Sequence, residues 1–176
     1  GVTWTHGEIA SGTISGDSYS IAEPAITVDK NNGILISVRS QKAGFYKKLL
    51  YKSTDNGATT QFYRIADELI SASCASSIFY DFENDLMLHS TPSNAGAART
   101  KYRLQYSTDN GANFIAAYRP FSDTHYVGYS QIIKLASNTY LIVFEGDEHF
   151  QLVNSSENIA ILMISTSEIL NHVNYS

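Results

Sequence analysis

The chain has 176 residues, 43% of them hydrophobic and 16% charged, which is enough for one globular domain and unlike the composition of a disordered segment. A formal net charge of −5 with scattered Lys and Arg argues against nucleic-acid binding, and a single cysteine excludes an internal disulfide. The longest apolar runs, such as residues 140–144, are too short to span a bilayer. Twelve Tyr and eight Phe favour strands over helices.

The first group of predicted strands comprises residues 23–28, 34–39, 48–52 and 61–65. The last two runs flank the stretch Ser53-Thr54-Asp55-Asn56-Gly57. Asp and Asn can hydrogen-bond the amides that follow them, and Gly accepts the positive φ of a tight turn. We therefore predict a hairpin here and interpret Asp55 and Gly57 as structural.

The second group repeats this layout with runs at residues 74–82, 86–90, 102–106 and 115–118. Its turn, 107–111, has the same sequence Ser-Thr-Asp-Asn-Gly, so Asp109 and Gly111 are also interpreted as structural. The opening residues 1–4 read as the back half of a third copy, so we expect that Gly1 is not a natural start.

The third group has runs at residues 129–135, 139–145 and 158–164, and residues 166–172 read as a short helix capped by Ser165 or Thr166. A repeated four-stranded meander of roughly 55 residues predicts an all-β β-propeller, and a β-sandwich is the alternative. About three blades do not close a ring, since propellers typically have about 4 to 8. We therefore expect a partner segment to cover the terminal blades.

One end of each predicted blade collects the residues that could carry chemistry. In an up-and-down meander, the start of strand 1, the end of strand 2 and the start of strand 3 share one end. The residues predicted at this end, near the propeller axis, are Glu23, Arg39, Arg99, Tyr129 and Glu145. The planar guanidinium group of arginine can donate two parallel hydrogen bonds to a carboxylate, so two arginines facing one pocket indicate an anionic ligand. The alternative is that Arg39 only pairs with a neighbouring acid.

At these residues the sequence resembles the sialidase (neuraminidase) superfamily. The Ser-Thr-Asp-Asn-Gly turns resemble its structural Asp-boxes. The segment from Glu23 to Arg39 resembles the one with a catalytic glutamate and an arginine of the carboxylate-binding triad. Arg99 precedes an Asp-box as another triad arginine does, and residues 128–130 and 144–145 resemble the nucleophilic tyrosine motif and a supporting glutamate.

The resemblance implies a six-bladed propeller and a bacterial exo-α-sialidase, secreted or on the cell surface, that hydrolyses terminal sialic acids with retention. Tyr129 would be the nucleophile, Glu23 its base, Arg39 and Arg99 the ligands of the substrate carboxylate, and Glu145 a support. The family's first triad arginine and its general-acid aspartate have no counterpart here. Residues 1–176 are therefore expected to form the C-terminal half of the catalytic domain, completed by N-terminal blades on the same or another chain.

Two other functions stay open, and no cofactor is expected. One is a propeller that binds sialoglycans without catalysis, as in a lectin-like or phage tail domain, and the other is a trans-sialidase. Asp147, Glu148 and His149 resemble a metal cluster, but adjacent residues rarely converge on one ion, so no metal site is predicted. Cys74 is interpreted as a small packed residue rather than a nucleophile.

Overall fold

The computed structural model describes residues 7, 10–119, 123–146 and 158–171. Nearly all of the regular secondary structure in these residues consists of antiparallel strands. The strands and the one helix are β1 (Thr13–Ile14), β2 (Asp17–Ser18), β3 (Ile21–Val28), β4 (Ile34–Ser40), β5 (Lys47–Ser53), β6 (Gln61–Ile70), β7 (Ser77–Asp81), β8 (Leu86–Pro92), β9 (Tyr102–Ser107), β10 (Ile115–Tyr118), β11 (Val127–Ala136), β12 (Thr139–Gly146), β13 (Asn158–Ser165) and α1 (Thr166–Leu170). The predicted all-β class is confirmed. Gly1, in the back half of the expected third turn copy, lies outside the described residues.

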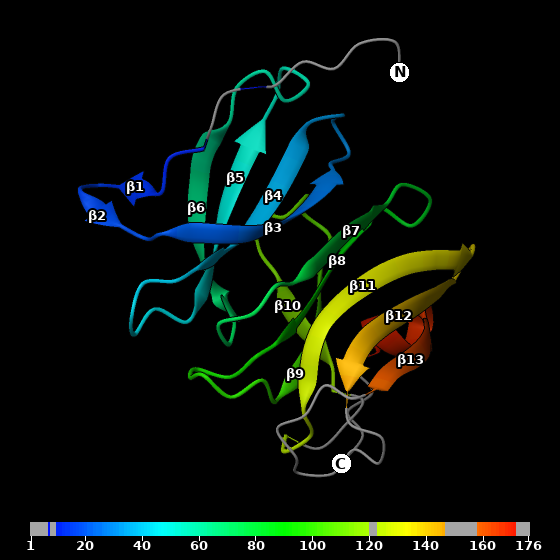
Figure 1. Ribbon diagram of the computed structural model, residues 1–176. Helices are drawn as coiled ribbons and strands as arrows, with labels where there is room; N and C mark the ends of the chain where they lie inside the picture. The colour runs from blue at the N-terminus through cyan, green and yellow to red at the C-terminus, as the bar shows by residue number, and fades with distance from the viewer. Residues whose placement is uncertain (1–6, 8–9, 120–122, 147–157, 172–176) are drawn as a thin grey trace.

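Three sheets follow one another in chain order, like successive blades of a propeller (Figure 1). Blade 1 has the order β3-β4-β5-β6, and blade 2 has the order β7-β8-β9-β10. Blade 3 is β11-β12-β13, with three strands in the described residues rather than four. Among the first strands of the blades, β7 lies against both β3 and β11. The chain therefore has the predicted propeller architecture, in an open arc.

The blades are joined by apolar cores and by repeated polar contacts. One core joins blades 1 and 2, and another joins blades 2 and 3 and includes Ile169 of α1. Between the first strands, the backbone N–H of Tyr80 donates to Thr27 Oγ1 and that of Ile132 donates to Ser77 Oγ, each at 3.0 Å. The same kind of bond thus repeats at both blade junctions.

Both Ser-Thr-Asp-Asn-Gly stretches connect the third and fourth strands of their blades, as predicted. Asp55 Oδ1 accepts hydrogen bonds from Ser53 Oγ at 2.8 Å and from the Thr59 N–H at 2.9 Å. Asp109 Oδ1 accepts the equivalent bonds from Ser107 Oγ at 2.7 Å and from the Asn113 N–H at 2.9 Å. The glycines have φ of 86° and 79°, so the turns need the residue type that the sequence supplies.

The element boundaries differ from expectation at several points. β7 begins at Ser77, so Cys74 precedes the strand instead of starting it. β6 continues to Ile70 because register shifts in its pairing with β5 let the strand bend. The small β1–β2 hairpin was not predicted, and α1 ends at Leu170 with Ser165 as its cap in a capping box. The described residues contain no helix that is long and apolar enough to cross a membrane.

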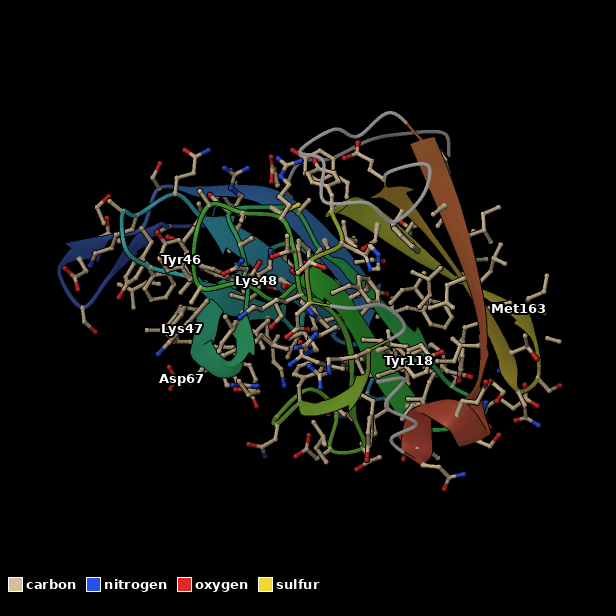
Figure 2. All side chains as sticks on the ribbon, turned by 90° about the horizontal axis from the view of Figure 1, so that it is seen from below. Tyr46, Lys47, Lys48, Asp67, Tyr118 and Met163 are labelled. Atoms are coloured by element: carbon tan, nitrogen blue, oxygen red, sulfur yellow. The ribbon has the colours of Figure 1, made fainter. Side chains whose placement is uncertain are left out.

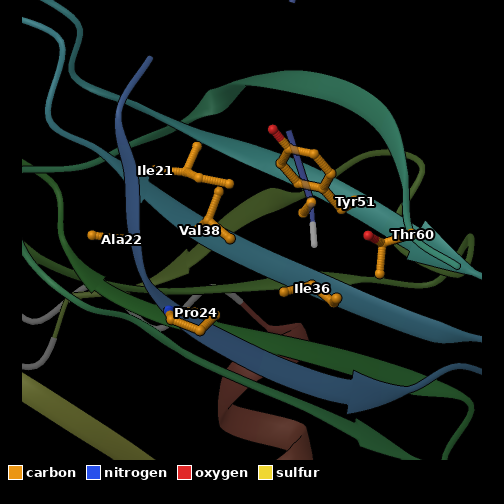
Figure 3. Close-up of a pocket in the computed structure, with 8 residues that line it drawn as sticks. Ile21, Ala22, Pro24, Ile36, Val38, Tyr51 and Thr60 are labelled. Atoms are coloured by element: carbon orange, nitrogen blue, oxygen red, sulfur yellow. The ribbon is translucent and has the colours of Figure 1, made fainter. Parts of the chain in front are cut away.

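The two ends of the arc expose apolar surface. On β13, Ile159, Ile161 and Met163 are each about two-thirds exposed, while Ile164 packs into the core. At the other end, an open hollow of about 380 Å³ lies against blade 1 (Figure 3). Its walls include the side chains of Ile36, Val38 and Tyr51. A sheet face of this kind normally packs against another layer.

Candidate active site

The structure brings the five predicted site residues together, from blades 1, 2 and 3. Glu23 lies in β3 and Arg39 in β4, Tyr129 in β11 and Glu145 in β12, while Arg99 precedes β9. Glu23 has a φ of 48°, a strained conformation for a residue with a side chain, at the point where the β3–β4 register shifts. The bulge turns the Glu23 carboxylate out of the regular alternation of β3 and toward the other blades.

Arg39 holds the Glu23 carboxylate from the neighbouring strand. Its Nη1 donates to Glu23 Oε1 at 2.8 Å, and its Nε donates to Ser73 Oγ at 3.0 Å. Both side chains are partly exposed, 19% for Arg39 and 29% for Glu23. Arg39 thus pairs with a neighbouring acid, as the alternative drawn from the sequence has it, and that acid is Glu23.

Tyr129 of blade 3 reaches the same carboxylate in blade 1. Its hydroxyl donates to Glu23 Oε1 at 2.7 Å, although the two residues are 106 positions apart in the sequence. The other oxygen, Glu23 Oε2, is buried and has no hydrogen-bond partner within the described part of the chain. Tyr129 is 39% exposed, so its ring remains open to a ligand.

Arg99 and Glu145 surround Tyr129 on its other sides. The Arg99 guanidinium lies 4.9 Å from the centroid of the Tyr129 ring, a cation–π geometry, and its Nη1 is 3.9 Å from Glu145 Oε2. Glu145 Oε2 also accepts the backbone N–H of Tyr129 at 3.3 Å. A Cβ at Gly128 would lie 2.2 Å from this oxygen, so only glycine leaves room for Glu145 here.

The contacts set the protonation of the Glu23–Tyr129 pair. Burial alone would raise the pKa of Glu23, but the hydrogen bonds from Arg39 and Tyr129 and the charges of Arg39 and Arg99 outweigh burial and lower it. The hydrogen bond to Glu23 raises the pKa of Tyr129, with burial and the Glu23 charge acting in the same direction. At neutral pH the site therefore pairs an ionised carboxylate with a neutral phenol.

Three residues of this region were missed by the sequence analysis: Lys48, Ser73 and Tyr126. Tyr126 Oη accepts a hydrogen bond from Arg99 Nη1 at 3.4 Å, and the Lys48 ammonium is fully buried behind Arg39. Hydroxyl groups in loops and a second lysine in a Lys-Lys pair carry no distinct signal in one sequence. Cys74 is fully buried, and burial raises the pKa of its thiol, which fits a packed residue.

Open space lies next to the polar cluster. One hollow of about 440 Å³ is lined by residues 97–99 and Tyr126, and another of about 230 Å³ is lined by Tyr129, Glu145 and their neighbours. The residues that the structure describes contain no group of His, Cys, Asp and Glu that could hold a metal ion. The set Asp147, Glu148 and His149 lies outside those residues.

This arrangement gathers a carboxylate, a phenol and two guanidinium groups around one space. The Glu23 carboxylate can accept the Tyr129 proton directly at 2.7 Å, the distance that general-base catalysis requires. Two guanidinium groups flank the pair and would attract an anionic group near the phenol.

No protein-family model matches the chain, and no curated protein matches it in sequence. Solved structures do match. The Hadza microbial sialidase Hz136 has a TM-score of 0.66 at 18% identity over 85% of this chain and 28% of its own. The NanB sialidase from Streptococcus pneumoniae has a TM-score of 0.64 at 17% identity over 84% of this chain and 24% of its own.

A leech intramolecular trans-sialidase, complexed with 2,7-anhydro-Neu5Ac, has a TM-score of 0.67 at 15% identity over 90% of this chain and 25% of its own. The chain thus has a sialidase-like fold and spans about a quarter of the length of these proteins. At this level of identity the likeness concerns the fold, and function has to be argued from the site.

Proposed function

We propose that this chain is the C-terminal half of the catalytic domain of a retaining exo-α-sialidase that hydrolyses terminal sialic acids of glycoconjugates. The observation that carries the proposal is the 2.7 Å hydrogen bond from the Tyr129 phenol to the Glu23 carboxylate, flanked by Arg39 and Arg99. A carboxylate-binding pocket alone needs the arginines but neither a base nor a phenol. The pairing therefore favours catalysis over simple binding.

A phenol suits the substrate's charge. The anomeric carbon of sialic acid bears its own carboxylate, which would repel an Asp or Glu nucleophile. Sialidases with a tyrosine nucleophile are a known exception to the use of two carboxylates in glycosidases. An unperturbed phenol has a pKa of about 10, so it needs a base at neutral pH. Glu23 is placed to be that base.

In the first step, the Tyr129 oxygen attacks the anomeric carbon while its proton passes to Glu23. The glycosidic bond breaks, and its electron pair goes to the leaving oxygen, which takes a proton from an acid. We propose that this acid belongs to the further blades that the family resemblance implies. In the second step, water attacks the anomeric carbon and gives a proton to the conjugate base of that acid, the bond to Tyr129 breaks, and Glu23 returns its proton to the Tyr129 oxygen.

The substrate carboxylate would lie between Arg39 and Arg99. Arg39 binds Glu23 and Ser73 through two of its nitrogens, but a guanidinium has five N–H donors, so others remain for a substrate. Arg99 faces Tyr129, and the contacts of its Nη1 are long, 3.4 Å to Tyr126 Oη and 3.9 Å to Glu145 Oε2, so it can turn toward an anion. Glu145 would keep Arg99 and the backbone of Tyr129 in place.

The test is chemical trapping in the complete protein. A fluorinated sialosyl donor should label Tyr129, and Tyr129→Phe and Glu23→Gln should each lower kcat by orders of magnitude. The double variant should cost little more than the worse single variant, because residues that act as a unit are not additive. Tyr63→Phe, at an exposed tyrosine of β6, is the matched control and should keep full activity. A label on another residue would overturn the assignment.

Transfer rather than hydrolysis is the second candidate, since one structural neighbour is an intramolecular trans-sialidase. Both reactions share the first step, and they differ in the group that attacks the tyrosine-linked intermediate. Mass spectrometry of the product separates them, because hydrolysis adds water and an intramolecular transfer yields the anhydro sugar. If the protein binds sialosides but releases neither product, the non-catalytic glycan-binding function replaces both.

The open arc also bears on partners and location. The exposed faces of blades 1 and 3 suit further blades, on the same polypeptide or another, and sialylated glycans outside the cell are the substrates that the proposal implies. We therefore propose secretion or display at a bacterial surface, which cell fractionation would test.

A further inference from the structure

Lys48 is a fully buried charged residue immediately behind the proposed active site. It lies in β5 directly opposite Arg39 in β4, and its relative exposure is 0%. Figure 2 shows Lys48 further inside the molecule than Lys47, which lies near Asp67 at the surface. Two cations opposite each other on neighbouring strands repel, and burying an ammonium group costs free energy. Lys48 therefore destabilises the fold unless its contacts compensate for these costs.

The contacts of Lys48 lead to the segment between β6 and β7. Its Nζ donates to the backbone oxygen of Cys74 at 2.6 Å. The preceding residue, Ser73, accepts the hydrogen bond from Arg39 Nε at 3.0 Å. One buried amine therefore holds the short piece of chain that fixes one edge of the Arg39 guanidinium, while the other edge faces Glu23 at 2.8 Å.

We propose that Lys48 is a positioning residue of the site: through Cys74 and Ser73 it fixes the Arg39 guanidinium and thereby the Glu23 carboxylate that faces Tyr129. This inference deepens the proposed function and rests on it for its effect on catalysis. Lys48 itself is buried and touches no substrate.

The charge of Lys48 adds a second effect. Burial lowers its pKa to about 8, while nearby Glu23 favours and Arg39 opposes its charged form. His89 of β8, whose Nε2 lies 3.1 Å from Ser37 Oγ, is kept neutral by burial, and burial raises the pKa of the Cys74 thiol. Lys48 is thus mostly cationic at pH 7 and mostly neutral at pH 9, so the site loses one positive charge over this range.

The test is Lys48→Met in the complete protein, with Lys47→Met on the same strand as the matched control. Affinity for the unsaturated sialic acid analogue DANA should fall about tenfold, the size of one lost charge-assisted hydrogen bond. kcat/KM should fall by up to about 100-fold through misplacement of Glu23. Lys47→Met should keep both values.

Two readouts separate positioning from a loss of folding. Ser73→Ala removes the hydroxyl without opening the core, and its effect on DANA affinity should not add to that of Lys48→Met if the two act in one chain of contacts. The affinity of the parent should fall between pH 7 and 9, and this fall should be absent in Lys48→Met. Additive effects, or an unchanged alkaline fall, would overturn the proposal.

The structural part can be judged even if the sialidase proposal fails. A parent that neither binds DANA nor cleaves a sialoside refutes the proposed function alone. A crystal structure of Lys48→Met then decides the remaining point. Rotation of the Arg39 guanidinium away from Glu23 supports the role of Lys48, whereas an unchanged Arg39 contradicts it.

Discussion

The carboxylate of Glu145 occupies the space that a side chain at position 128 would need. Its Oε2 would lie 2.2 Å from a Cβ at Gly128. We predict that Gly128→Ala displaces Glu145, frees the Tyr129 backbone and lowers kcat/KM by about 10- to 100-fold with little change in global stability. Steady-state kinetics and thermal unfolding measure the two effects. Gly12→Ala, where the nearest atom would be 3.6 Å away, is the control. Equal activity of both variants contradicts the prediction.

Arg99→Lys tests the anion site at the same scale. Lysine keeps the charge but loses the planar fork, so binding of DANA should weaken by about 1 to 3 kcal/mol. Titration calorimetry measures the change. Arg119→Lys, at an arginine paired with Asp123, keeps the parent affinity if the effect is specific to the site. If Arg99→Lys binds DANA as tightly as the parent, Arg99 does not bind the substrate carboxylate.

Part of the site could be predicted residue by residue, and part could not. The blade repeat places Glu23 and Tyr129 at equivalent positions, and Arg39 and Glu145 likewise, so their convergence follows from topology. The positive φ of Glu23 and the burial of Lys48 do not follow, because both depend on a bulge and on packing against the neighbouring blade. In the pair Lys47-Lys48, nothing in the sequence marks which side chain faces inward.

Among the elements, the two Ser-Thr-Asp-Asn-Gly turns differ in what surrounds their glycines. At Gly57 a Cβ would meet only Ile34 Cδ1, at 3.5 Å, whereas at Gly111 it would meet Leu35 Cδ2 at 2.7 Å and Met87 Sδ at 3.1 Å. Gly57→Ala should cost about 1 kcal/mol for the positive φ alone. Gly111→Ala should cost about 1 to 3 kcal/mol more, because it overpacks the junction of blades 1 and 2. Denaturant unfolding measures the difference, and equal costs would contradict this account.

Asp81, at the end of β7, links blade 2 to blade 3. Its carboxylate accepts hydrogen bonds from Lys134 Nζ at 2.6 Å and from Tyr140 Oη at 2.7 Å. Burial would raise its pKa, but these bonds lower it from 3.8 to about 2. A lowered folded-state pKa stabilises the fold above the unfolded value, and this stability is lost as the pH falls from about 4 to about 2.

We therefore predict that Asp81 contributes about 2 kcal/mol of this acid dependence. The free energy of unfolding of Asp81→Asn should fall less steeply between pH 4 and 2 than that of the parent. Asp67→Asn, which removes a carboxylate exposed on β6, controls for the change in net charge. If the free energies of unfolding of the parent and of Asp81→Asn fall in parallel between pH 4 and 2, Asp81 does not cause the loss of stability in acid.

The strand pattern itself could be read from the sequence, because alternation and turn residues fix most boundaries within a few residues. The exceptions have physical causes. β7 starts late because Ser73 and Cys74, in the segment before it, contact Arg39 and Lys48, and β6 continues because its register shifts against β5. Tertiary contacts of this kind leave no periodic signal in the sequence.

For the whole molecule, the exposed ends of the arc predict how residues 1–176 behave alone. Ile159, Ile161 and Met163 on blade 3 and the hollow on blade 1 leave apolar surface in water. We expect the isolated chain to bind the dye ANS, to self-associate and to lack sialidase activity. Dye fluorescence and size-exclusion chromatography test this, with the complete protein as control. A monomeric, ANS-silent and active chain would contradict the prediction.

The contact between Glu23 and Tyr129 joins the first strands of blades 1 and 3, while β7 of blade 2 lies between them. The width of the middle blade therefore sets the distance between the Glu23 carboxylate and the Tyr129 phenol. Insertions in the turns between the outer strands of blade 2 would leave this distance unchanged. A change in the volume of the core at either blade junction would alter it directly. Changes of sequence should therefore be tolerated in the outer turns of blade 2 and restricted among the core residues on its two packed faces.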